Sequence, residues 1–236
     1  MALNIDLHRK KMIQIRIDIV KSEYGKILWF KWWTLLYLLY SLDRFSTDLD
    51  FNLLDTVDEE QMMKDISKIC KKHGIIKDIY NKHHTIFFLV DYASGEMNIK
   101  IEISKKTNKN DTYAYKSIMG YQALCMNIDC CFTNKLVALI ERWNTVSRDL
   151  YDIHFFMKNN ISINEALLKE RTWLSYAGYL KKVLAFIPKH FNKKNLLAGL
   201  WELVEKRQKN FIKNELLQET MQYIEIELEI RKGVVI

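Results

Sequence analysis

Two aspartates one residue apart carry the clearest chemical signal in the sequence. They lie in segment 44–51, Arg-Phe-Ser-Thr-Asp-Leu-Asp-Phe, whose last residues alternate between polar and apolar. That alternation predicts a strand over 48–54 that presents Asp48 and Asp50 on one face, with Cα atoms about 7 Å apart. Two carboxylates so placed can bind one divalent cation, or bridge two, together with the phosphate oxygens of a substrate.

A third acid could complete such a site. In segment 98–104, Asn-Ile-Lys-Ile-Glu-Ile-Ser, the same alternation places Glu102 on the polar face of another predicted strand. If the two strands are neighbours, three carboxylates could form a two-metal site for in-line displacement at phosphorus. An isolated Asp-x-Asp also occurs on solvated strand faces and in glycosyltransferases, and the pattern alone leaves these alternatives open.

A second cluster of charges follows in two predicted helices. In the first helix, the spacing places Lys135 and Arg142 along one stripe, where a lysine can meet a triphosphate as a point charge. In the second, Asp149 and Asp152 are three residues apart and share a helical face. Taken singly, each of these residues is more typical of a surface salt bridge than of a site.

Taken together, the motifs form an ordered set. An apolar strand is followed by Lys-x-x-Thr at 31–34, Arg-x-Ser-x-Asp-Leu-Asp-Phe at 44–51, a later strand acid, Lys-x-x-Ala-Leu-x-x-Arg at 135–142 and Arg-Asp-Leu-Tyr-Asp at 148–152. This set resembles the AbiEii/AbiGii toxin family over about 28–156, a little over half of the chain. The second motif, followed by the last about 100 residues later, is the most specific part of the resemblance.

The resemblance implies a fold and a reaction. The fold would be α/β (α+β), with a nucleotidyltransferase-type mixed sheet and flanking helices, followed by a C-terminal helical bundle. The protein would be a toxin of an abortive-infection or toxin–antitoxin system, neutralised by a cognate antitoxin. It would transfer NMP from an NTP to an RNA hydroxyl and release pyrophosphate, with Mg²⁺ or Mn²⁺ as the cofactor. Some similar proteins modify the 3′ end of tRNA, so tRNA is the expected acceptor.

The resemblance also implies residue roles. Asp48 and Asp50 would be catalytic, metal-binding acids, with Glu102 as the third metal ligand. Lys135 would contact the nucleotide phosphates, and Asp149 would be the catalytic acid of the last motif. The remaining predicted nucleotide-binding residues are Thr34, Ser46, Arg142, Arg148 and Asp152.

One position departs from the family pattern. The family usually has Gly-Gly-Thr after its first strand, because glycines let backbone N–H groups approach phosphates, whereas this chain has Trp32-Trp33-Thr34. Two indoles, each burying about 150–250 Å², should fill that space. The chain is then either a catalytically impaired member that acts as an RNA- or protein-binding module, or a member in which another backbone segment binds the phosphates. Stacking of a tryptophan on the base fits less well, because this loop faces phosphate.

The elements that must position these residues follow from periodicity and composition. Seven glycines and one proline in 236 residues are few for an all-β fold, and 49% hydrophobic residues exclude disorder. We expect a nucleotidyltransferase core over 1–125 and a helical domain over 126–236 that completes the active-site cleft. The predicted strands cover 13–19, 48–54, 75–80, 85–91, 97–104 and 112–118, with 26–31 either a strand or the start of the next helix. The predicted helices cover 34–42, 58–72, 133–143, 147–157, 164–172, 174–186 and 193–221, with Pro188 separating the last two.

Segment 223–230, Tyr-Ile-Glu-Ile-Glu-Leu-Glu-Ile, alternates with period two directly after a predicted helix. It is predicted either as a strand or as the end of that helix. As a strand, its glutamates could lie opposite Arg16 in a pairing of the two chain ends, since opposite charges across strands are weakly favourable.

The net charge of +7 is concentrated in two flanks of the chain. Segment 1–31 carries seven basic and three acidic residues and 158–215 carries twelve and five, whereas the segment between them is slightly acidic. Such flanks could hold a polyanion over an acidic centre, or they could be ordinary solvated faces. The four cysteines lack metal-binding spacing, and no stretch is apolar enough for a signal peptide or a membrane span. We therefore expect a cytoplasmic protein without a membrane partner.

Overall fold

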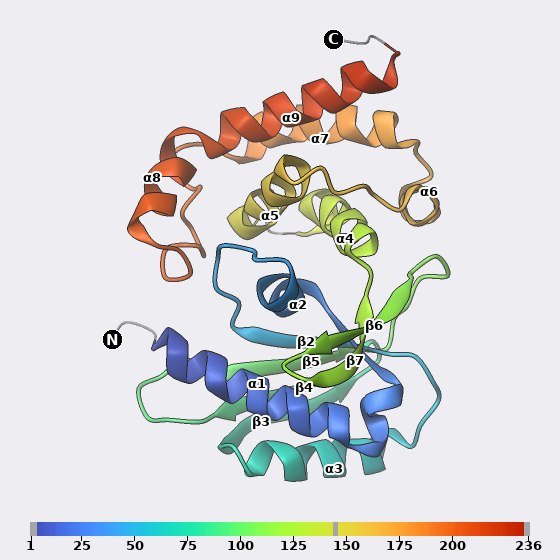
Figure 1. Cartoon of the computed structure of the whole chain (residues 1–236), viewed down its shortest axis with the longest axis vertical. Coiled ribbons are helices and arrows are strands. Elements are labelled where there is room, and N and C mark those ends of the chain that lie inside the picture. Colours follow the sequence, from blue (N-terminus) through green and yellow to red (C-terminus); the bar gives the residue numbers. More distant parts are fainter. Residues whose placement is uncertain (1–3, 144–145, 234–236) are drawn as a thin grey trace. The chain divides into compact units, whose positions relative to one another are not determined.

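The computed structural model describes residues 4–143 and 146–233, without the side chains of Trp32 and Trp33. The chain divides into two units (Figure 1). The first, which we call the sheet unit, comprises Met1–Thr107 and Asp111–Asn127. The second, the helical unit, comprises Asn108–Asn110 and Ile128–Ile236. The predicted role of a helical domain in completing an active-site cleft stays a prediction.

The sheet unit is built on one mixed sheet, as the predicted fold class requires. Its strands are β1 (Leu28–Lys31), β2 (Asp48–Leu53), β3 (Ile75–Lys82), β4 (Thr85–Asp91), β5 (Ile99–Ser104), β6 (Tyr113–Ile118) and β7 (Tyr121–Met126). They are ordered β3-β4-β5-β2-β1-β7-β6 across the sheet. The interior strand β2 pairs parallel with β5 and antiparallel with β1. The strand that carries the two aspartates is therefore hydrogen-bonded on both sides.

Strand β7 is the one strand that the sequence did not predict. Its sequence, Tyr-Gln-Ala-Leu-Cys-Met, has no strict polar–apolar alternation. The turn before it defines the hairpin, because Met119 and Gly120 have φ values of 53° and 80°. Two successive residues with positive φ are typical of a type I′ hairpin turn, and they join β6 to β7 as an antiparallel pair.

The predicted strand over 13–19 is wrong, because this segment lies in helix α1 (Ile5–Lys21). The buried residues of α1 are His8, Met12, Ile15, Arg16 and Ile19. They recur at intervals of three and four, which is the helical period, whereas the alternate isoleucines that suggested a strand are unequally buried. The side chain of Asn4 caps the helix by accepting from the backbone N–H of Leu7.

Two further α-helices belong to the sheet unit, α2 (Trp32–Leu39) and α3 (Glu59–Lys71), with a short 3₁₀ turn at Glu23–Lys26. Helix α3 begins where predicted, since Asp58 caps it and two glutamates lie in its first turn. Gly74 follows its end, where a Cβ atom would lie 2.3 Å from the carbonyl oxygen of Asp91. In Figure 1, α1 and α3 lie on one side of the sheet and α2 on the other.

The helical unit contains only helices among its described elements. They are α4 (Ile128–Glu141), α5 (Ser147–Lys158), α6 (Glu165–Thr172), α7 (Tyr176–His190), α8 (Lys206–Asn214) and α9 (Leu216–Arg231). Helix α9 runs beside α7 and packs on α5 (Figure 1). No helix in the described part of the chain is both long and apolar enough to cross a membrane.

Two helix boundaries in this unit differ from the predictions. Pro188 does not separate two helices but lies inside the last turn of α7, which ends two residues later at His190. The predicted helix over 193–221 is broken into turns over 193–203, then α8 and then α9. Gly199, with a φ of 71°, lies in the turns and interrupts the helical path.

Segment 223–230 is helical and forms the second half of α9. The strand alternative, and with it the pairing with Arg16, is therefore wrong. The buried residues of α9 recur every four positions and set its inward face, whereas Ile226 and Ile230 are exposed. The inward residues are Leu216, Thr220, Ile224 and Leu228.

Candidate functional site

The two predicted metal-binding aspartates lie on one face of β2. Leu49 and Phe51 are fully buried on the opposite face, whereas Asp48 and Asp50 are only partly buried. The predicted strand and its alternation are thus confirmed. In the parallel pair of β2 and β5, Glu102 is the register partner of Asp50, so the predicted third acid lies on the adjacent strand and the same face.

The donor set on this face suits a cation that also binds substrate. Among the described residues, no three or more His, Cys, Asp and Glu side chains are grouped to hold a metal ion by themselves. Mg²⁺ is usually held by one or two carboxylates together with waters and substrate phosphates. Asp48 and Asp50 fit that chemistry, while a ligand role for the exposed Glu102 stays a prediction.

Two lysines accompany the aspartates on the same face. Lys31 of β1 is the register partner of Asp50, and Lys100 of β5 is the register partner of Asp48. Paired residues of adjacent strands point to the same side of a sheet. This face therefore combines carboxylates for a cation with ammonium groups for phosphate, and the two lysines were not among the predicted site residues.

Thr34 and Ser46, both predicted to bind nucleotide, are buried and contact each other. The hydroxyl of Thr34 lies 2.9 Å from that of Ser46 and also contacts the backbone carbonyl of Asp48. These contacts connect α2 to the segment that leads into β2. In this structure the two residues position the aspartates, and their contact with nucleotide phosphate stays a prediction.

His8 is a buried positioning residue that was not among the predicted site residues. Its Nε2 lies 3.0 Å from the carbonyl oxygen of Thr47, and its Nδ1 lies 2.9 Å from the hydroxyl of Tyr92. Because a carbonyl only accepts, Nε2 carries the proton and Nδ1 accepts from Tyr92. The ring therefore ties α1 to the residue just before Asp48. Helical spacing to Met12 was the signal that could have placed His8 in the core.

The burial of His8 should make the sheet unit less stable at mildly acidic pH. Burial lowers the pKa of His8 below 6.5, opposed in part by its hydrogen bond to Thr47. The unfolded chain therefore binds a proton at His8 more readily than the folded chain does. As a result, the free energy of unfolding falls as the pH drops below about 6.5. Between pH 7.5 and 5.5 this loss is at most about 1.4 kcal/mol, because pH 5.5 lies about one unit below 6.5.

Urea denaturation at the two pH values measures this loss. The variant His8→Gln should show a smaller difference between pH 7.5 and 5.5 than the wild type. The control His83→Gln, at an exposed turn position, should keep the wild-type difference. An unchanged pH difference in His8→Gln would show that other groups cause it.

The junction between β1 and α2 contains no separate loop. Strand β1 ends at Lys31, and helix α2 begins at Trp32 without a side-chain cap. The prediction that two indoles fill the phosphate loop falls on side chains outside the described residues. The backbone path places the first turn of α2 directly after the residue paired with Asp50. Uncapped N–H groups at the start of a helix can donate hydrogen bonds to an anion.

The second predicted cluster forms a buried ion network inside the helical unit. Lys135 of α4 donates to a carboxylate oxygen of Asp149 on α5, and its Nζ lies 3.1 Å from Oδ2 of Asp152. All three side chains are at most 1% exposed. The predicted shared face of the two aspartates is confirmed. Lys135 neutralises buried carboxylates here, and its predicted contact with nucleotide phosphates stays a prediction.

Two arginines from the predicted set lie beside this network. Arg142 is 40% exposed, and its guanidinium lies 3.3 Å from Oδ2 of Asp149, so the four groups together carry no net charge. Arg148 is partly exposed and forms no ion pair or side-chain hydrogen bond with a described residue. Of the predicted nucleotide-binding cations, Arg148 is thus the one whose guanidinium is most available to bind an anion.

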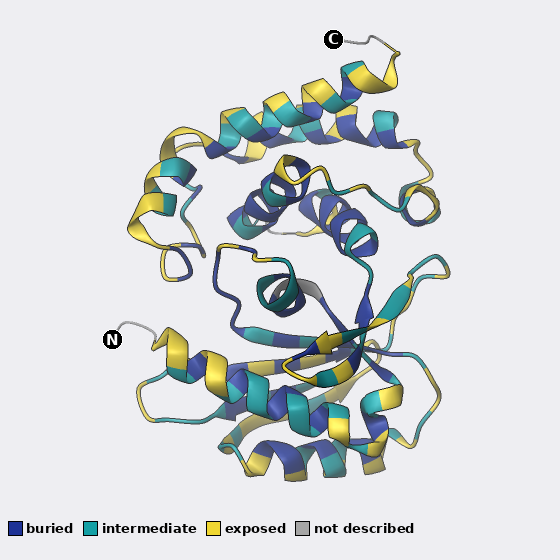
Figure 2. Cartoon of the chain, viewed as in Figure 1, coloured by how far each residue is buried: buried dark blue, intermediate teal, exposed yellow. Residues whose placement is uncertain are grey.

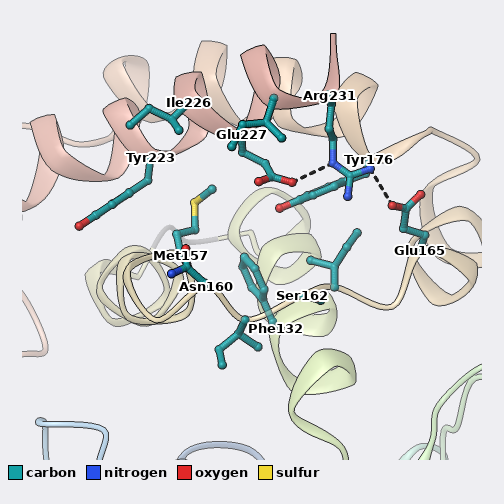
Figure 3. Close-up of a pocket in the computed structure, with 13 residues that line it drawn as sticks. Phe132, Met157, Asn160, Ser162, Glu165, Tyr176, Tyr223, Ile226, Glu227 and Arg231 are labelled. Carbon is teal, nitrogen blue, oxygen red and sulfur yellow. Dashed lines mark hydrogen bonds and ion pairs between the residues drawn. The ribbon is translucent and has the colours of Figure 1, made fainter. Parts of the chain in front are cut away.

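A pocket of about 340 Å³ also lies in the helical unit, but none of the predicted site residues lines it (Figure 3). Arg231 of α9 lines the pocket and forms ion pairs with Glu227 at 2.8 Å and with Glu165 at 2.7 Å. Its guanidinium lies 4.4 Å from the ring centroid of Tyr176. The arginine is therefore occupied in joining α6, α7 and α9, and the pocket does not extend the predicted nucleotide site.

Solved structures share this architecture. JHP933 from Helicobacter pylori has a TM-score of 0.61 and 22% identity, covering 99% of this chain and 97% of that one. A second Helicobacter pylori structure has a TM-score of 0.64 and 20% identity over 100% of both chains. MenT4, a nucleotidyltransferase toxin from Mycobacterium tuberculosis, has a TM-score of 0.51 and 14% identity, covering 98% and 90%. At these identities the likeness shows a shared fold, and two of the three structures are described as nucleotidyltransferases.

The family follows from the sequence itself. The model for "Nucleotidyl transferase AbiEii toxin, Type IV TA system" matches residues 16–222, most of the chain. The protein belongs to the AbiEii family of nucleotidyltransferase toxins, as its motifs predict. Membership implies a nucleotide substrate and an antitoxin partner. A comparison with curated proteins gives no match.

Proposed function

We propose that this protein is a metal-dependent toxin that transfers NMP from an NTP to an RNA acceptor, with tRNA as the acceptor. The observation that carries the proposal is the pair Asp48 and Asp50 on one face of an interior strand of a nucleotidyltransferase fold. Family membership supports the transferase class. The acidic pair supports the metal, and the basic flanks of the chain support a polyanionic acceptor.

The reaction exchanges one phosphoester bond for another. An RNA hydroxyl oxygen forms a bond to the α-phosphorus of the NTP, the bond from that phosphorus to the bridging oxygen breaks, and pyrophosphate leaves with its electron pair. The hydroxyl proton passes to a base or to water. A divalent cation bound by Asp48 and Asp50 would lower the pKa of the hydroxyl and neutralise charge on the phosphates.

The residues of the chain contribute position and charge to this reaction. Asp48 and Asp50 would orient the metal and the α-phosphate, and Lys31 and Lys100 would add positive charge beside them. The contact between Thr34 and the Asp48 carbonyl holds the strand start in place. In the helical unit, Arg148 would bind a phosphate of the nucleotide, because its guanidinium can form two parallel hydrogen bonds.

The proposal is tested by incubating the protein with each α-labelled NTP, Mg²⁺ or Mn²⁺ and total tRNA. Transfer of label to RNA that EDTA abolishes is the expected result. Co-expression with a cognate antitoxin should relieve growth arrest, which tests the partner. Absence of transfer with all four NTPs, in a sample that binds RNA, would contradict the enzymatic proposal.

Two tryptophans support a second candidate function, an RNA- or protein-binding module without catalysis. Trp32 and Trp33 replace the glycines expected at the phosphate loop. If this abolishes nucleotide use, calorimetry should detect no binding of Mg²⁺–ATP, Mg²⁺–GTP, Mg²⁺–CTP or Mg²⁺–UTP. Binding of any of them would favour the enzyme, with the first turn of α2 or another backbone segment in contact with the phosphates.

A further inference from the structure

Trp201 is an exposed indole that contacts lysines of α8. The residue is 54% exposed, although large aromatic residues are usually well buried. The Nζ atoms of Lys209 and Lys213 lie 4.3 and 5.7 Å from its ring centroid. Cation–π contacts at such distances orient the ring without removing it from solvent. The ring is thus held in place, and the part of it that the two ammonium groups do not cover is open to a ligand.

The lysines of α8 form a stripe next to this indole. Lys206, Lys209 and Lys213 recur at intervals of three and four, so they share one side of the helix. Ile212, the residue before Lys213, is fully buried and anchors α8 to the rest of the helical unit. Figure 2 shows α8 and the turn before it largely exposed. We call Trp201 together with these three lysines the Trp201 surface.

The charge around the Trp201 surface is positive and not neutralised. Segment 189–213 contains seven basic and two acidic residues. None of the seven forms an ion pair with a residue that the structure describes. Elsewhere in the same unit, by contrast, Arg171 and Arg231 pair with glutamates. Unpaired cations on a rigid helix are complementary to a polyanion.

The exposed indole favours a single-stranded nucleic acid over an acidic protein or double-stranded RNA as the ligand. An acidic protein surface would be matched by the lysines alone, whereas a single-stranded nucleic acid offers both phosphates and unpaired bases. Bases stack on exposed aromatic rings while neighbouring cations follow the backbone. Double-stranded RNA would leave Trp201 without a partner, because its bases are already stacked.

We propose that the Trp201 surface binds a single-stranded segment of the acceptor RNA. One unpaired base stacks on Trp201, and Lys206, Lys209 and Lys213 contact the flanking phosphates. The proposal rests on the proposed RNA acceptor and locates where the helical unit holds it. It is independent of catalysis, because none of these residues belongs to the acidic face or to the buried ion network.

The test is binding of a fluorescein-labelled single-stranded RNA of about 12 nucleotides to the full chain without NTP. Trp201→Ala should weaken binding about tenfold, as expected for loss of one stacked base, whereas Trp201→Phe should retain most of the affinity. The matched control is Trp173→Ala, since Trp173 is 87% exposed in the same unit without a lysine over its ring among the described contacts.

Salt dependence tests the lysines separately. The double variant Lys209→Gln and Lys213→Gln should flatten the slope of log K against log salt concentration by about 1.4, or about 0.7 for each lost phosphate contact. The control double variant Lys64→Gln and Lys71→Gln removes the same charge from exposed positions of α3 and should keep the wild-type slope.

Three outcomes would overturn the proposal. In the first, the wild type does not bind the RNA. In the second, the Trp201 and lysine variants bind the RNA as tightly as the wild type. In the third, the variants no longer bind an acidic peptide such as polyglutamate but still bind the RNA. Circular dichroism melts confirm that each variant is folded. If the protein binds RNA through the Trp201 surface but transfers no NMP, only the proposed function is refuted. If the protein transfers NMP but the variants bind RNA as the wild type does, only the role of the Trp201 surface is refuted.

Discussion

Replacing Asp50 by asparagine should lower the rate of NMP transfer by at least about 1000-fold. Asparagine keeps the shape of the side chain but removes the charge that holds a divalent cation beside the phosphates. A bound metal stabilises the transition state by several kcal/mol, and each 1.36 kcal/mol corresponds to a factor of ten in rate. Asp48→Asn should have a similar effect. The measurement is initial-rate transfer of labelled NMP to tRNA at saturating NTP.

Asp78 offers a matched control on the same sheet. Through successive register partners, Asp78 of β3 pairs with Leu89, Leu89 with Lys100, and Lys100 with Asp48, so all four lie in one row. Asp78 is exposed at the sheet edge, and Asp78→Asn should transfer NMP at the wild-type rate. Equal losses in Asp78→Asn and Asp50→Asn would mean that the overall charge of the face matters rather than the predicted pair. Wild-type activity in Asp50→Asn would refute its metal role.

The second large effect is expected on stability rather than on rate. Lys135→Ala would leave the carboxylates of Asp149 and Asp152 buried without their shared ammonium group. Removing one partner of a buried ion pair typically costs about 3–5 kcal/mol. We therefore expect a folded but strongly destabilised helical unit, seen as an early transition in urea denaturation followed by circular dichroism. A wild-type midpoint would contradict this structural role of Lys135.

A neutral version of the network separates its structural role from a catalytic one. The triple variant Lys135→Met, Asp149→Asn and Asp152→Asn removes all three charges while keeping similar volumes. It should recover part of the stability that Lys135→Ala loses, because no charge is then left buried without a partner. If the stable triple variant transfers NMP normally, the network only holds α4 against α5. If it is stable but inactive, the catalytic roles predicted for Lys135 and Asp149 gain support.

Strands β2 and β5, which carry the three acids, were predictable because their alternation is regular and each has one buried face. The segment of β1 was left open between a strand and the start of a helix, because its apolar run is short and lacks alternation. Helix α1 was not, because its isoleucines satisfy a strand period while its true buried face depends on His8 and Arg16, two residues that composition places outside a core. Burial of Arg16 against the ring of Phe30, at 5.4 Å, is a tertiary effect that no local pattern contains.

The candidate site was predictable in its residue types and spacing but not in its environment. Helical spacing correctly grouped Asp149 with Asp152, yet nothing in the spacing showed that Lys135 is buried between them. The spacing of Thr34 and Ser46 likewise did not show that their hydroxyls contact each other. Such facts depend on how elements far apart in the chain pack together, and that packing is not encoded in any single segment.

The interior position of β2 has a consequence for hydrogen exchange. Strands β3 and β6 end the sheet and can open singly, whereas β2 opens only when its pairing with both β1 and β5 is lost. The backbone amides of 48–53 should therefore be among the last to exchange in deuterated water, close to the rate of global unfolding. The two aspartates would then keep their mutual spacing through every partial opening of the sheet edges, so the ability to hold a cation would disappear only with the sheet unit itself.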